Sequence, residues 1–362
     1  MKFAINGLTL INKEVYGVHR YAFEIMLALD EMIEPNQAEL IVPVECEKDF
    51  GFKNIKITKI GNKPTGNAIV NRLKKNKWNN NIFKKYVKDN SLISIDLTLN
   101  FPKFGCDIIA VHDCIPNLFP EFYRSLKDKL FRKMLLKSQK LAIKRCKYLV
   151  TVSESAKNDI LKFYEIENSK IVIIPNAWQH FSRIKEDDSI LNKFNLKDKG
   201  YYFSLGSRSP NKNIEWIMSA AKLNPNDIFV VSGSNSVFKS YNDVSKEELH
   251  NVIFTGFLSD GEIKSLMKHA KVFIQPSKYE GFGIPPMEAM STGTKCIVSN
   301  VSSLPEIYGK SVWYIDPYKY ESINLDEITK DKIEDNSVVL NKFSWKKSAS
   351  DLLALISRIN LD

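Results

Sequence analysis

Short apolar runs alternate with longer amphipathic stretches from the start of the chain. In the first half, such runs predict buried strands at 1–5, 40–43, 55–58, 106–111, 148–152 and 171–177. Between the runs, apolar residues recur at helical spacing, as at 18–32, where Tyr21, Ile25 and Leu29 fall on one face. This regular alternation is typical of an α/β fold with a parallel sheet.

The second half repeats the alternation. Apolar runs predict strands at 201–205, 228–232, 252–254, 272–276, 295–298 and 312–315. The connection between the halves, near 178–198, is polar, and an amphipathic helix follows residue 343. A length of 362 residues is too great for one typical core. We therefore predict two α/β domains with a terminal helical segment, at 1–178, 179–343 and 344–362.

The stretch 279–293 combines a strand end, a glycine-rich turn and the start of a helix. Gly281 and Gly283 allow unusual backbone torsions and a close approach to a ligand. Pro285 suits the first turn of a helix, and Gly293 suits its end. The sequence therefore predicts a helix whose N-terminus points back at the glycine turn.

Two glutamates flank this turn. Glu280 lies on the turn, and Glu288 lies about one helical turn into the predicted helix. A helix N-terminus presents free N–H groups and a positive dipole end, which favour anionic or hydroxyl-rich groups. For the two glutamates alone, an ordinary strand–turn–helix with a helix-capping acid explains the pattern equally well.

A basic loop follows the first strand of the second half. Arg208 and Lys212 lie on a turn before a helix predicted at 213–223. There they can gather phosphate oxygens by charge-assisted hydrogen bonds, although two surface cations give the same pattern. The loop does not match the P-loop sequence of nucleotide triphosphatases. The strand-end loops at Gly233 and Gly256 are candidates for a nucleobase pocket.

His112 and Asp113 follow directly after the strand predicted at 106–111. In an open parallel sheet, ligands bind beyond the carboxyl ends of the strands, so both residues emerge where a substrate should lie. A lone histidine is nevertheless more often structural than catalytic. Tyr16 and Gly17 lie at a loop-to-helix junction, where the glycine either approaches a phosphate or simply begins the helix.

Positive charge is concentrated in the first half of a chain with a net charge of +10. Residues 52–90 contain eleven Lys and Arg and one acid, and residues 121–150 contain ten and two. Near 70–88 the cations alternate with apolar residues such as Trp78 and Phe83, a pattern that suits a lipid headgroup boundary. A solvated helix face explains it equally well. No nucleic acid is expected as a partner, because no binding motif accompanies the charge.

The five cysteines are scattered and show no CxxC spacing. This usage favours a reducing cytoplasm and disfavours a disulfide framework or a zinc site. No apolar run approaches the roughly eighteen residues that a membrane span needs, and the N-terminus does not resemble a signal peptide.

The stretch 279–293 resembles the Glu-x7-Glu signature of retaining glycosyltransferases of family four, the glycosyl transferases group 1. The segment 111–121, VHDCIPNLFPE, resembles the His-Asp segment of that family, and the loop at 208–213 resembles its diphosphate clamp. The resemblance is weak before residue 100 and strong from about 200 to 317. At 176–177 this chain has Asn-Ala where many members have Asn-Gly. The resemblance implies the GT-B fold: two Rossmann-like domains that face a central cleft, and a terminal helix that crosses back to the first domain.

The resemblance also implies roles for the residues of the second domain. Glu280 would hold the donor sugar together with the backbone of the turn, and Glu288 would accept hydrogen bonds from the ribose. Arg208 and Lys212 would clamp the donor diphosphate in the place of a divalent metal, and no Asp-x-Asp metal motif occurs in the sequence. We therefore expect no metal and no cofactor. The remaining donor-side positions are Phe282, Gly283, Ile284 and Gly256.

In the first domain, the resemblance implies that His112 approaches the donor sugar and Gly17 the donor phosphates. Asp113 and Tyr16 are expected on the acceptor side. The implied reaction is a retaining, metal-independent transfer of a mannose- or glucose-type hexosyl group from a UDP- or GDP-sugar to a saccharide acceptor. Because of the basic first half, we expect a lipid-linked acceptor of bacterial surface polysaccharide (O-antigen or capsule), and an enzyme at the inner face of the plasma membrane. Two alternatives stay open: a nucleotide-sugar 2-epimerase of the same fold, and a non-catalytic sugar-nucleotide-binding protein.

Overall fold

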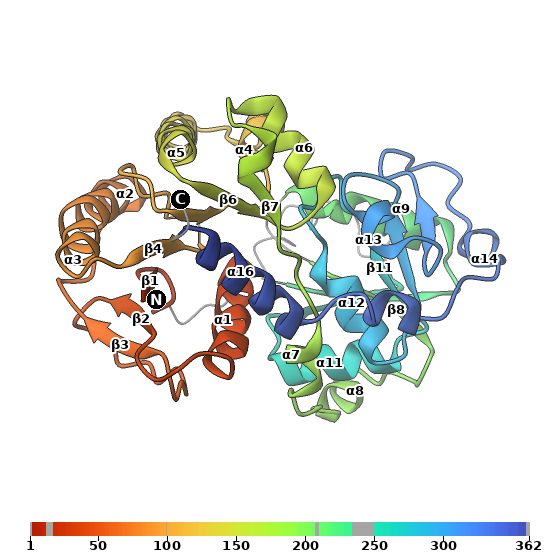
Figure 1. Cartoon of the computed structure of the whole chain (residues 1–362). Coiled ribbons are helices and arrows are strands. Elements are labelled where there is room, and N and C mark those ends of the chain that lie inside the picture. The colour runs from red at the N-terminus through yellow and green to blue at the C-terminus, as the bar shows by residue number, and fades with distance from the viewer. Residues whose placement is uncertain (1, 12–16, 99, 207–209, 234–249, 360–362) are drawn as a thin grey trace. The chain divides into compact units, whose positions relative to one another are not determined.

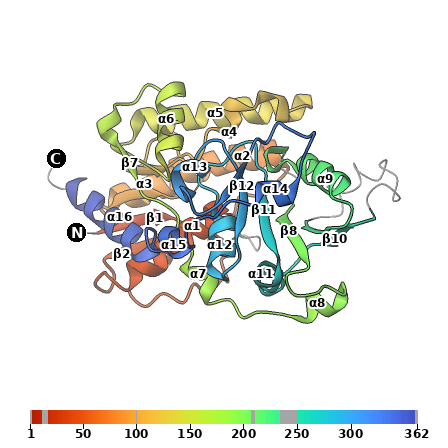
Figure 2. The same ribbon diagram turned by 90° about the vertical axis from the view of Figure 1, so that its right-hand side faces the viewer.

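The computed structural model describes residues 2–11, 17–98, 100–206, 210–233 and 250–359 (Figures 1 and 2). The chain forms two compact units. The first contains Met1–Asn176 together with Trp345–Asp362, and the second contains Ala177–Ser344. The sequence-based boundaries were 178/179 and 343/344. The final helix is thus part of the first unit.

The first unit is built on a seven-stranded parallel sheet with the strand order β3-β2-β1-β4-β5-β6-β7. In chain order its strands are β1 Phe3–Asn6, β2 Ala38–Val42, β3 Lys56–Lys59, β4 Ile93–Asp96, β5 Ile108–Ala110, β6 Tyr148–Thr151 and β7 Ile171–Ile173. The central strands β1, β2, β4 and β5 are buried throughout, as expected for a parallel sheet covered on both faces.

Strand β4 was not predicted from the sequence. Its residues Ile93–Asp96 read ISID, so polar residues interrupt the apolar run. Buried polar groups need hydrogen-bond partners, and the two polar residues of the strand, Ser94 and Asp96, have them. The backbone N–H and the hydroxyl of Ser94 donate to Asp107, and those of Thr98 donate to Asp96. These contacts come from beyond the strand, where sequence periodicity cannot detect them.

Helices flank the first sheet. They are α1 Gly17–Asp30, α2 Ala68–Lys77, the π-helix η1 Trp78–Phe83, α3 Lys84–Asp89, α4 Ile115–Leu118, the 3-10 turn η2 Pro120–Phe122, α5 Leu126–Arg145, α6 Glu154–Phe163, the 3-10 turn η3 Asn168–Lys170, and α16 Trp345–Ile359. Several begin with the caps that sequence rules favour. Ser125 closes a capping box with Asp128, and Ser153 accepts from the N–H of Ala156.

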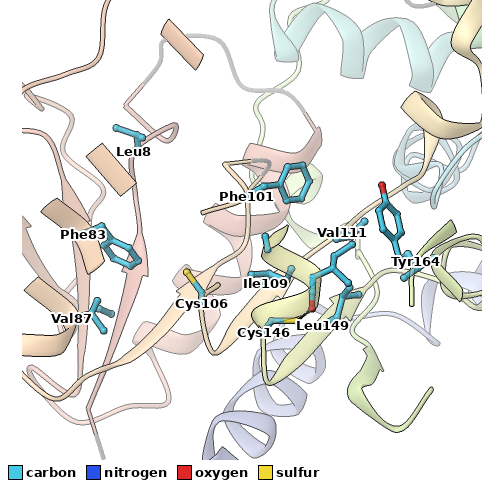
Figure 3. Packing of buried hydrophobic residues seen from close by; sticks show 14 of the residues in the cluster. Leu8, Phe83, Val87, Phe101, Cys106, Ile109, Val111, Cys146, Leu149 and Tyr164 are labelled. Atoms are coloured by element: carbon cyan, nitrogen blue, oxygen red, sulfur yellow. Dashed lines mark hydrogen bonds between the residues drawn. The ribbon is translucent and has the colours of Figure 1, made fainter. Parts of the chain in front are cut away.

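The core of the first unit includes aromatic residues from the basic stretch. Trp78 is 2% exposed and Phe83 is 0% exposed, and their rings stack at 6.1 Å. The expectation that these aromatics lie at a headgroup boundary is therefore wrong, because they fill the space between helix and sheet. Figure 3 shows part of the same core, in which Ile109 and Leu149 lie on paired strands.

Helix α16 belongs to this unit through specific contacts. The Trp345 ring meets Tyr21 of α1 edge-on at 6.1 Å, and Ser348 Oγ donates to the Pro175 carbonyl at 2.8 Å. The buried residues of the helix recur at helical spacing and include Leu352 and Leu355. The chain thus returns to the first unit after completing the second.

The second unit is built on a six-stranded parallel sheet with the order β10-β9-β8-β11-β12-β13. Its strands are β8 Tyr201–Leu205, β9 Ile228–Ser232, β10 Val252–Gly256, β11 Val272–Gln275, β12 Cys296–Ser299 and β13 Trp313–Ile315. Its helices are α7 Gln179–Ser182, α8 Ser189–Lys193, the 3-10 turn η4 Pro210–Lys212, α9 Ile214–Leu223, α11 Asp260–His269, α12 Ile284–Ser291, α13 Leu304–Tyr308, α14 Leu325–Ile328 and α15 Ser337–Leu340. All six predicted strands of this half are present.

A search of the described residues found no helix that combines the length and the apolarity needed to cross a membrane.

Candidate active site

Two loops at the carboxyl end of the second sheet are tied together by side-chain amides. Asn213 lies in the left-handed region at φ 56°, and its Nδ2 donates to the carbonyls of Pro276 and Pro317 at 2.9 and 2.8 Å. Asn211 Nδ2 donates to the Tyr279 carbonyl at 3.0 Å. The loop after β8 is thereby fixed against the loop after β11, which places Lys212 beside the predicted glutamate motif.

Glu280 is the centre of this frame. Its Oε1 accepts hydrogen bonds from Lys212 Nζ at 2.6 Å, Gln275 Nε2 at 2.8 Å and Ser277 Oγ at 2.6 Å. The other oxygen, Oε2, accepts none from the residues that the structure describes. Its backbone is also held, since the N–H donates to Ser302 Oγ at 2.9 Å. The carboxylate is therefore fixed through one oxygen while the second can still accept from a ligand hydroxyl.

Lys212 retains donors in this arrangement. An ammonium group has three N–H donors, and one of them is directed to Glu280. About a quarter of the side chain is exposed. Lys212 can therefore hold an anionic oxygen next to the carboxylate that would hold a sugar hydroxyl.

Helix α12 begins directly after the glycine turn, as predicted. Gly283 has φ +87°, and a Cβ there would lie 2.6 Å from Leu304 Cδ2, so the position requires glycine. The Tyr308 hydroxyl donates to the Gly283 carbonyl and holds the turn. Ile284 is the first residue of the helix. The N–H groups in the first turn of the helix have no partner within the helix, and they face the glycine turn. The Phe282 ring is buried edge-on against Phe343, so only its backbone can face a ligand.

Glu288 lies on the buried side of α12. Its Oε1 is 2.7 Å from His180 Nε2, which must donate because a carboxylate only accepts. Both residues are buried, and Glu288 keeps slightly more exposure than the histidine. Its Oε2 accepts no hydrogen bond within the described part of the chain. Glu288 therefore has the same form as Glu280, with one oxygen held by the protein and the other available.

Glycines crowd the ends of three neighbouring strands. A Cβ on Gly206 would lie 2.2 Å from the Ser232 carbonyl, and one on Gly233 would lie 2.9 Å from the Gly206 carbonyl. Gly233 donates in turn to the Gly256 carbonyl at 2.9 Å. The backbones of β8, β9 and β10 thus approach closely here, and Gly256 lies at the strand end where a nucleobase was expected.

His112 lies in the first unit and is buried after β5. Its Nε2 lies 3.2 Å from the Leu97 carbonyl, so the proton is on that nitrogen, and Tyr21 packs edge-on at 4.6 Å. Burial lowers the pKa of His112 to about 4, although the bond to Leu97 opposes this. The imidazole is therefore neutral at physiological pH, with Nδ1 as an acceptor.

The other predicted residues of the first unit are less constrained. Asp113 Oδ1 accepts from the Ile115 N–H at 3.0 Å, which shapes the loop into α4. Gly17 is the exposed first residue of α1, and a Cβ there would meet none of the described residues within 4 Å. Arg208 and Tyr16 lie outside the described residues.

Several residues around the glutamates were not found from the sequence. His180 is 108 residues from Glu288 in sequence, and no spacing rule links them. Gln275 and Ser277 carried a weaker signal, since both are polar and follow a buried apolar run. Among the described residues, no group of three or more His, Cys, Asp or Glu side chains could hold a metal ion.

Residues 186–342 match the sequence model of a family described as glycosyl transferases group 1. The chain is similar to the O-antigen chain mannosyltransferase RfbU of Salmonella typhimurium, at 26% identity in an alignment of 325 positions that covers 86% of this chain and 86% of the relative.

Two solved structures with 15% identity have the same fold. Sucrose-phosphate synthase from Thermosynechococcus elongatus gives a TM-score of 0.76 and covers 100% of this chain and 99% of that one. WaaG, a glycosyltransferase involved in lipopolysaccharide biosynthesis, gives a TM-score of 0.61, and the match covers 96% of this chain and 94% of WaaG. The two parallel-sheet domains, the family match over the second domain and the relatives confirm the predicted fold and support the prediction of a hexosyltransferase. This chain has the GT-B fold and is a hexosyltransferase, and its residues 186–342 match the glycosyl transferases group 1.

Proposed function

We propose that this enzyme transfers a mannosyl group, with retention of configuration, from a nucleoside diphosphate sugar to a lipid-linked saccharide during surface-polysaccharide assembly. The observation that carries the proposal is the contact between Lys212 and Glu280 at 2.6 Å, at the carboxyl ends of β8 and β11. A cation and a carboxylate held together there suit a donor that carries both phosphates and hydroxyls. The choice of mannose rests on the name of the relative RfbU.

The reaction requires stabilisation of a leaving diphosphate. As the glycosidic bond lengthens, negative charge develops on the phosphate oxygens. Lys212 is already fixed by Glu280, so it can stabilise that charge without rearranging in the transition state. Arg208 is proposed as the second cation of this clamp. The N–H groups at the start of α12 supply further positive potential.

The two glutamates would hold the donor at separate points. We assign the free oxygen of Glu280 to a sugar hydroxyl and that of Glu288 to the ribose. His112 would accept a hydrogen bond from the transferred sugar through Nδ1, because its Nε2–H is occupied by Leu97. In the proposed mechanism the departing phosphate takes the acceptor proton, so His112 need not act as a base.

Helix α5 provides the proposed contact with the membrane. Its buried residues all lie in the second half of the helix, whereas Leu126 is 85% exposed and Leu130 is 47% exposed near its start. Lys127 and Lys129 lie between them. Exposed leucines among lysines suit an anionic lipid surface. We therefore base the proposed peripheral location at the inner face of the plasma membrane on helix α5. The stretch 70–88 no longer supports it, because its aromatic residues Trp78 and Phe83 are buried.

The donor site is tested by thermal unfolding with GDP, UDP and their hexose conjugates. A ligand at 100 times its Kd stabilises the folded protein by about 2.7 kcal/mol. We expect a rise in Tm with one nucleotide, lost in Lys212→Ala and kept in Lys310→Ala, an exposed lysine of the same domain. No rise with any nucleotide would contradict the phosphate clamp.

Retention is tested on the product. The enzyme is incubated with the donor whose nucleotide raises Tm and with a lipid-linked saccharide acceptor, and the one-bond C1–H1 coupling constant of the new linkage is measured by NMR. The donor and product should have the same anomeric configuration. Product with the opposite configuration would overturn the retaining mechanism, and nucleotide binding without any transfer would favour a non-catalytic binding protein.

Membrane contact is tested by flotation with vesicles of phosphatidylcholine, with and without phosphatidylglycerol. We expect binding that requires the anionic lipid and is lost in Leu126→Ser/Leu130→Ser. Equal binding to both vesicle types would count against the electrostatic part of the proposal.

A further inference from the structure

A pocket of about 490 Å³ lies in the first domain, and none of the residues assigned to the donor lines it. It is formed by the loop that follows β3 and by one side of α2 and η1. The residues that matter for its chemistry are Gly61, Lys63, Lys74, Lys77, Trp78 and Ile82. Its volume is in the range of small-molecule sites. Its position beyond the carboxyl end of β3 is where parallel sheets bind ligands.

The floor of this pocket is apolar and has a defined shape. The Trp78 ring is buried and Ile82 is partly buried. Gly61 has φ +61°, and a Cβ there would lie 2.5 Å from Ile82 Cδ1 and 3.2 Å from Trp78 Nε1. Any larger residue at Gly61 would therefore collide with the floor. Glycine at this position keeps the shape of the pocket.

Trp78 also supplies an unused donor. Its Nε1 is buried and donates to none of the residues that the structure describes. Buried N–H groups in folded proteins are nearly always paired, so this unpaired donor beneath Gly61 breaks a rule of stable folding, as residues at functional sites often do. Trp78 is also the first residue of the π-helix η1, and such segments occur frequently at functional sites.

The rim of the pocket is cationic. Lys63, Lys74 and Lys77 are exposed, and none forms an ion pair with an acid in the described ranges. The carboxylate of Glu45 accepts the backbone N–H of Lys63 at 2.7 Å. Burial, together with Arg72 and Lys63, lowers the pKa of the neighbouring Lys75, which shows how closely like charges gather here. Such a group of cations attracts an anion.

We propose that this pocket binds a phosphate ester of an apolar alcohol. Lys63, Lys74 and Lys77 hold the phosphate, and Trp78 and Ile82 contact the first carbons of the chain. The inference rests on the proposed lipid-linked acceptor, in which a phosphate joins the apolar chain to the saccharide. It goes further in naming the residues that recognise the phosphate of the lipid. Any ligand of this site has an anionic phosphate next to an alkyl or prenyl group.

The test is calorimetric titration of the full chain with farnesyl phosphate, with farnesol and inorganic phosphate as partial probes. We expect farnesyl phosphate to bind more tightly than either. In Lys74→Glu/Lys77→Glu the affinity should fall by roughly tenfold or more, because two charge-assisted contacts are reversed. The control is Lys85→Glu/Lys88→Glu, two exposed lysines of α3 that change the net charge equally. Its affinity should stay within about twofold of the wild type, since only the long-range, salt-screened field changes.

A second variant blocks the pocket without changing its charge. Asn81 is exposed and lines the pocket. Asn81→Phe should place a ring in the opening and abolish farnesyl phosphate binding, while the melting temperature stays close to that of the wild type. Unchanged affinity in Asn81→Phe would overturn the assignment of the pocket.

Three further outcomes would overturn the proposal. If farnesyl phosphate does not bind, the proposed ligand class is wrong. If farnesol binds as tightly as farnesyl phosphate, the phosphate is not recognised. Equal loss in both double variants shows that a diffuse positive field, and no defined site, attracts the anion. The rise in Tm with GDP or UDP is measured on the same variants and should be unchanged. A missing nucleotide shift in the wild type would instead contradict the proposed function, so the two failures are distinguishable.

Discussion

At the carboxyl edge of the second sheet, the buried charges are paired. Glu280 holds Lys212, and Glu288 holds His180. At the carboxyl edge of the first sheet, the buried carboxylate of Asp96 has mainly neutral hydrogen-bond partners, among them Thr98. Among the described residues, the nearby Asn79 Nδ2 and Asn100 Oδ1 are buried without a hydrogen bond.

The difference teaches how each edge relates to stability. A paired and hydrogen-bonded carboxylate is fixed in one geometry before any ligand arrives, which is the condition for electrostatic catalysis. An unpaired buried polar atom costs about 1–3 kcal/mol of stability. Residues that break the rules of stable folding in this way concentrate at functional sites. The charge pairing at the second edge is therefore the arrangement that electrostatic catalysis requires, whereas the first edge bears the cost of unpaired polar atoms beside Asp96.

The largest expected effect comes from breaking the pairing in the second domain. Lys212→Ala should lower kcat/KM by about 10²–10³, because it removes a fixed cation from the charge that develops on the leaving group. The measurement is steady-state transfer from the donor identified by thermal unfolding. Lys310→Ala serves as the control and should behave as the wild type. Wild-type kcat in Lys212→Ala would remove this residue from the chemistry.

The His180–Glu288 pair should contribute less. Each single variant, His180→Ala or Glu288→Gln, should weaken nucleotide binding by about tenfold, and the double variant should be little worse than either. The reason is that we propose His180 to act by orienting the carboxylate of Glu288. A double-mutant cycle on nucleotide Kd measures this coupling. Additive losses would show that the two residues act independently.

The first edge makes a different prediction, about pH. Burial raises the pKa of Asp96 to about 7, although bonds from Thr98 oppose this, and burial lowers that of His112 to about 4. Between pH 4 and 6.5 the native state therefore binds an extra proton at Asp96 and the unfolded state binds one at His112. The two effects on the free energy of unfolding oppose each other.

Variants should separate these two effects. In Asp96→Asn only His112 titrates, so stability should rise by about 1 kcal/mol from pH 5 to pH 6. In His112→Gln only Asp96 titrates, so stability should fall by about the same amount over that range. Denaturant unfolding of the first domain at several pH values, followed by a local probe, provides the measurement. Slopes of the same sign in both variants would contradict the assigned protonation states.

The smallest expected effect comes from removing one of the hydrogen bonds that fix the carboxylate of Glu280 at the edge of the second sheet. Ser277→Ala removes one of the three hydrogen bonds to Glu280 Oε1. Because Lys212 and Gln275 still hold the carboxylate, kcat/KM should fall by only about two- to fivefold. The same kinetic assay detects it. A loss as large as that of Lys212→Ala would mean that the hydroxyl contacts the substrate directly.

The sequence predicted those parts of the molecule that depend on local patterns. The six strands of the second sheet were all found, because buried parallel strands read as continuous apolar runs. The turn at Gly283 and the helix after it followed from glycine and proline placement. Strand β4 was missed because its polar residues interrupt the apolar run; their partners, Asp107 and Thr98, lie outside the strand.

Contacts distant in sequence could not be predicted. The amphipathic pattern around Trp78 indicated an exposed apolar face, but the direction in which a helix points is set by the sheet on which it packs. The same limit applies to His180, whose only relation to Glu288 is spatial. The sequence thus named charged residues of the candidate site, and the structure adds the groups that orient Glu280 and Glu288.

Helix α16 has a consequence for the order in which the chain matures on the ribosome. The second domain is one continuous segment, whereas the first is completed by Trp345–Ile359, which is synthesised after the second domain. Domains form as units once their residues are available. The second domain can therefore finish folding while Tyr21 of the first is still without the Trp345 ring that covers it. A chain that stops at residue 344 should keep a folded second domain and leave the first open to proteolysis.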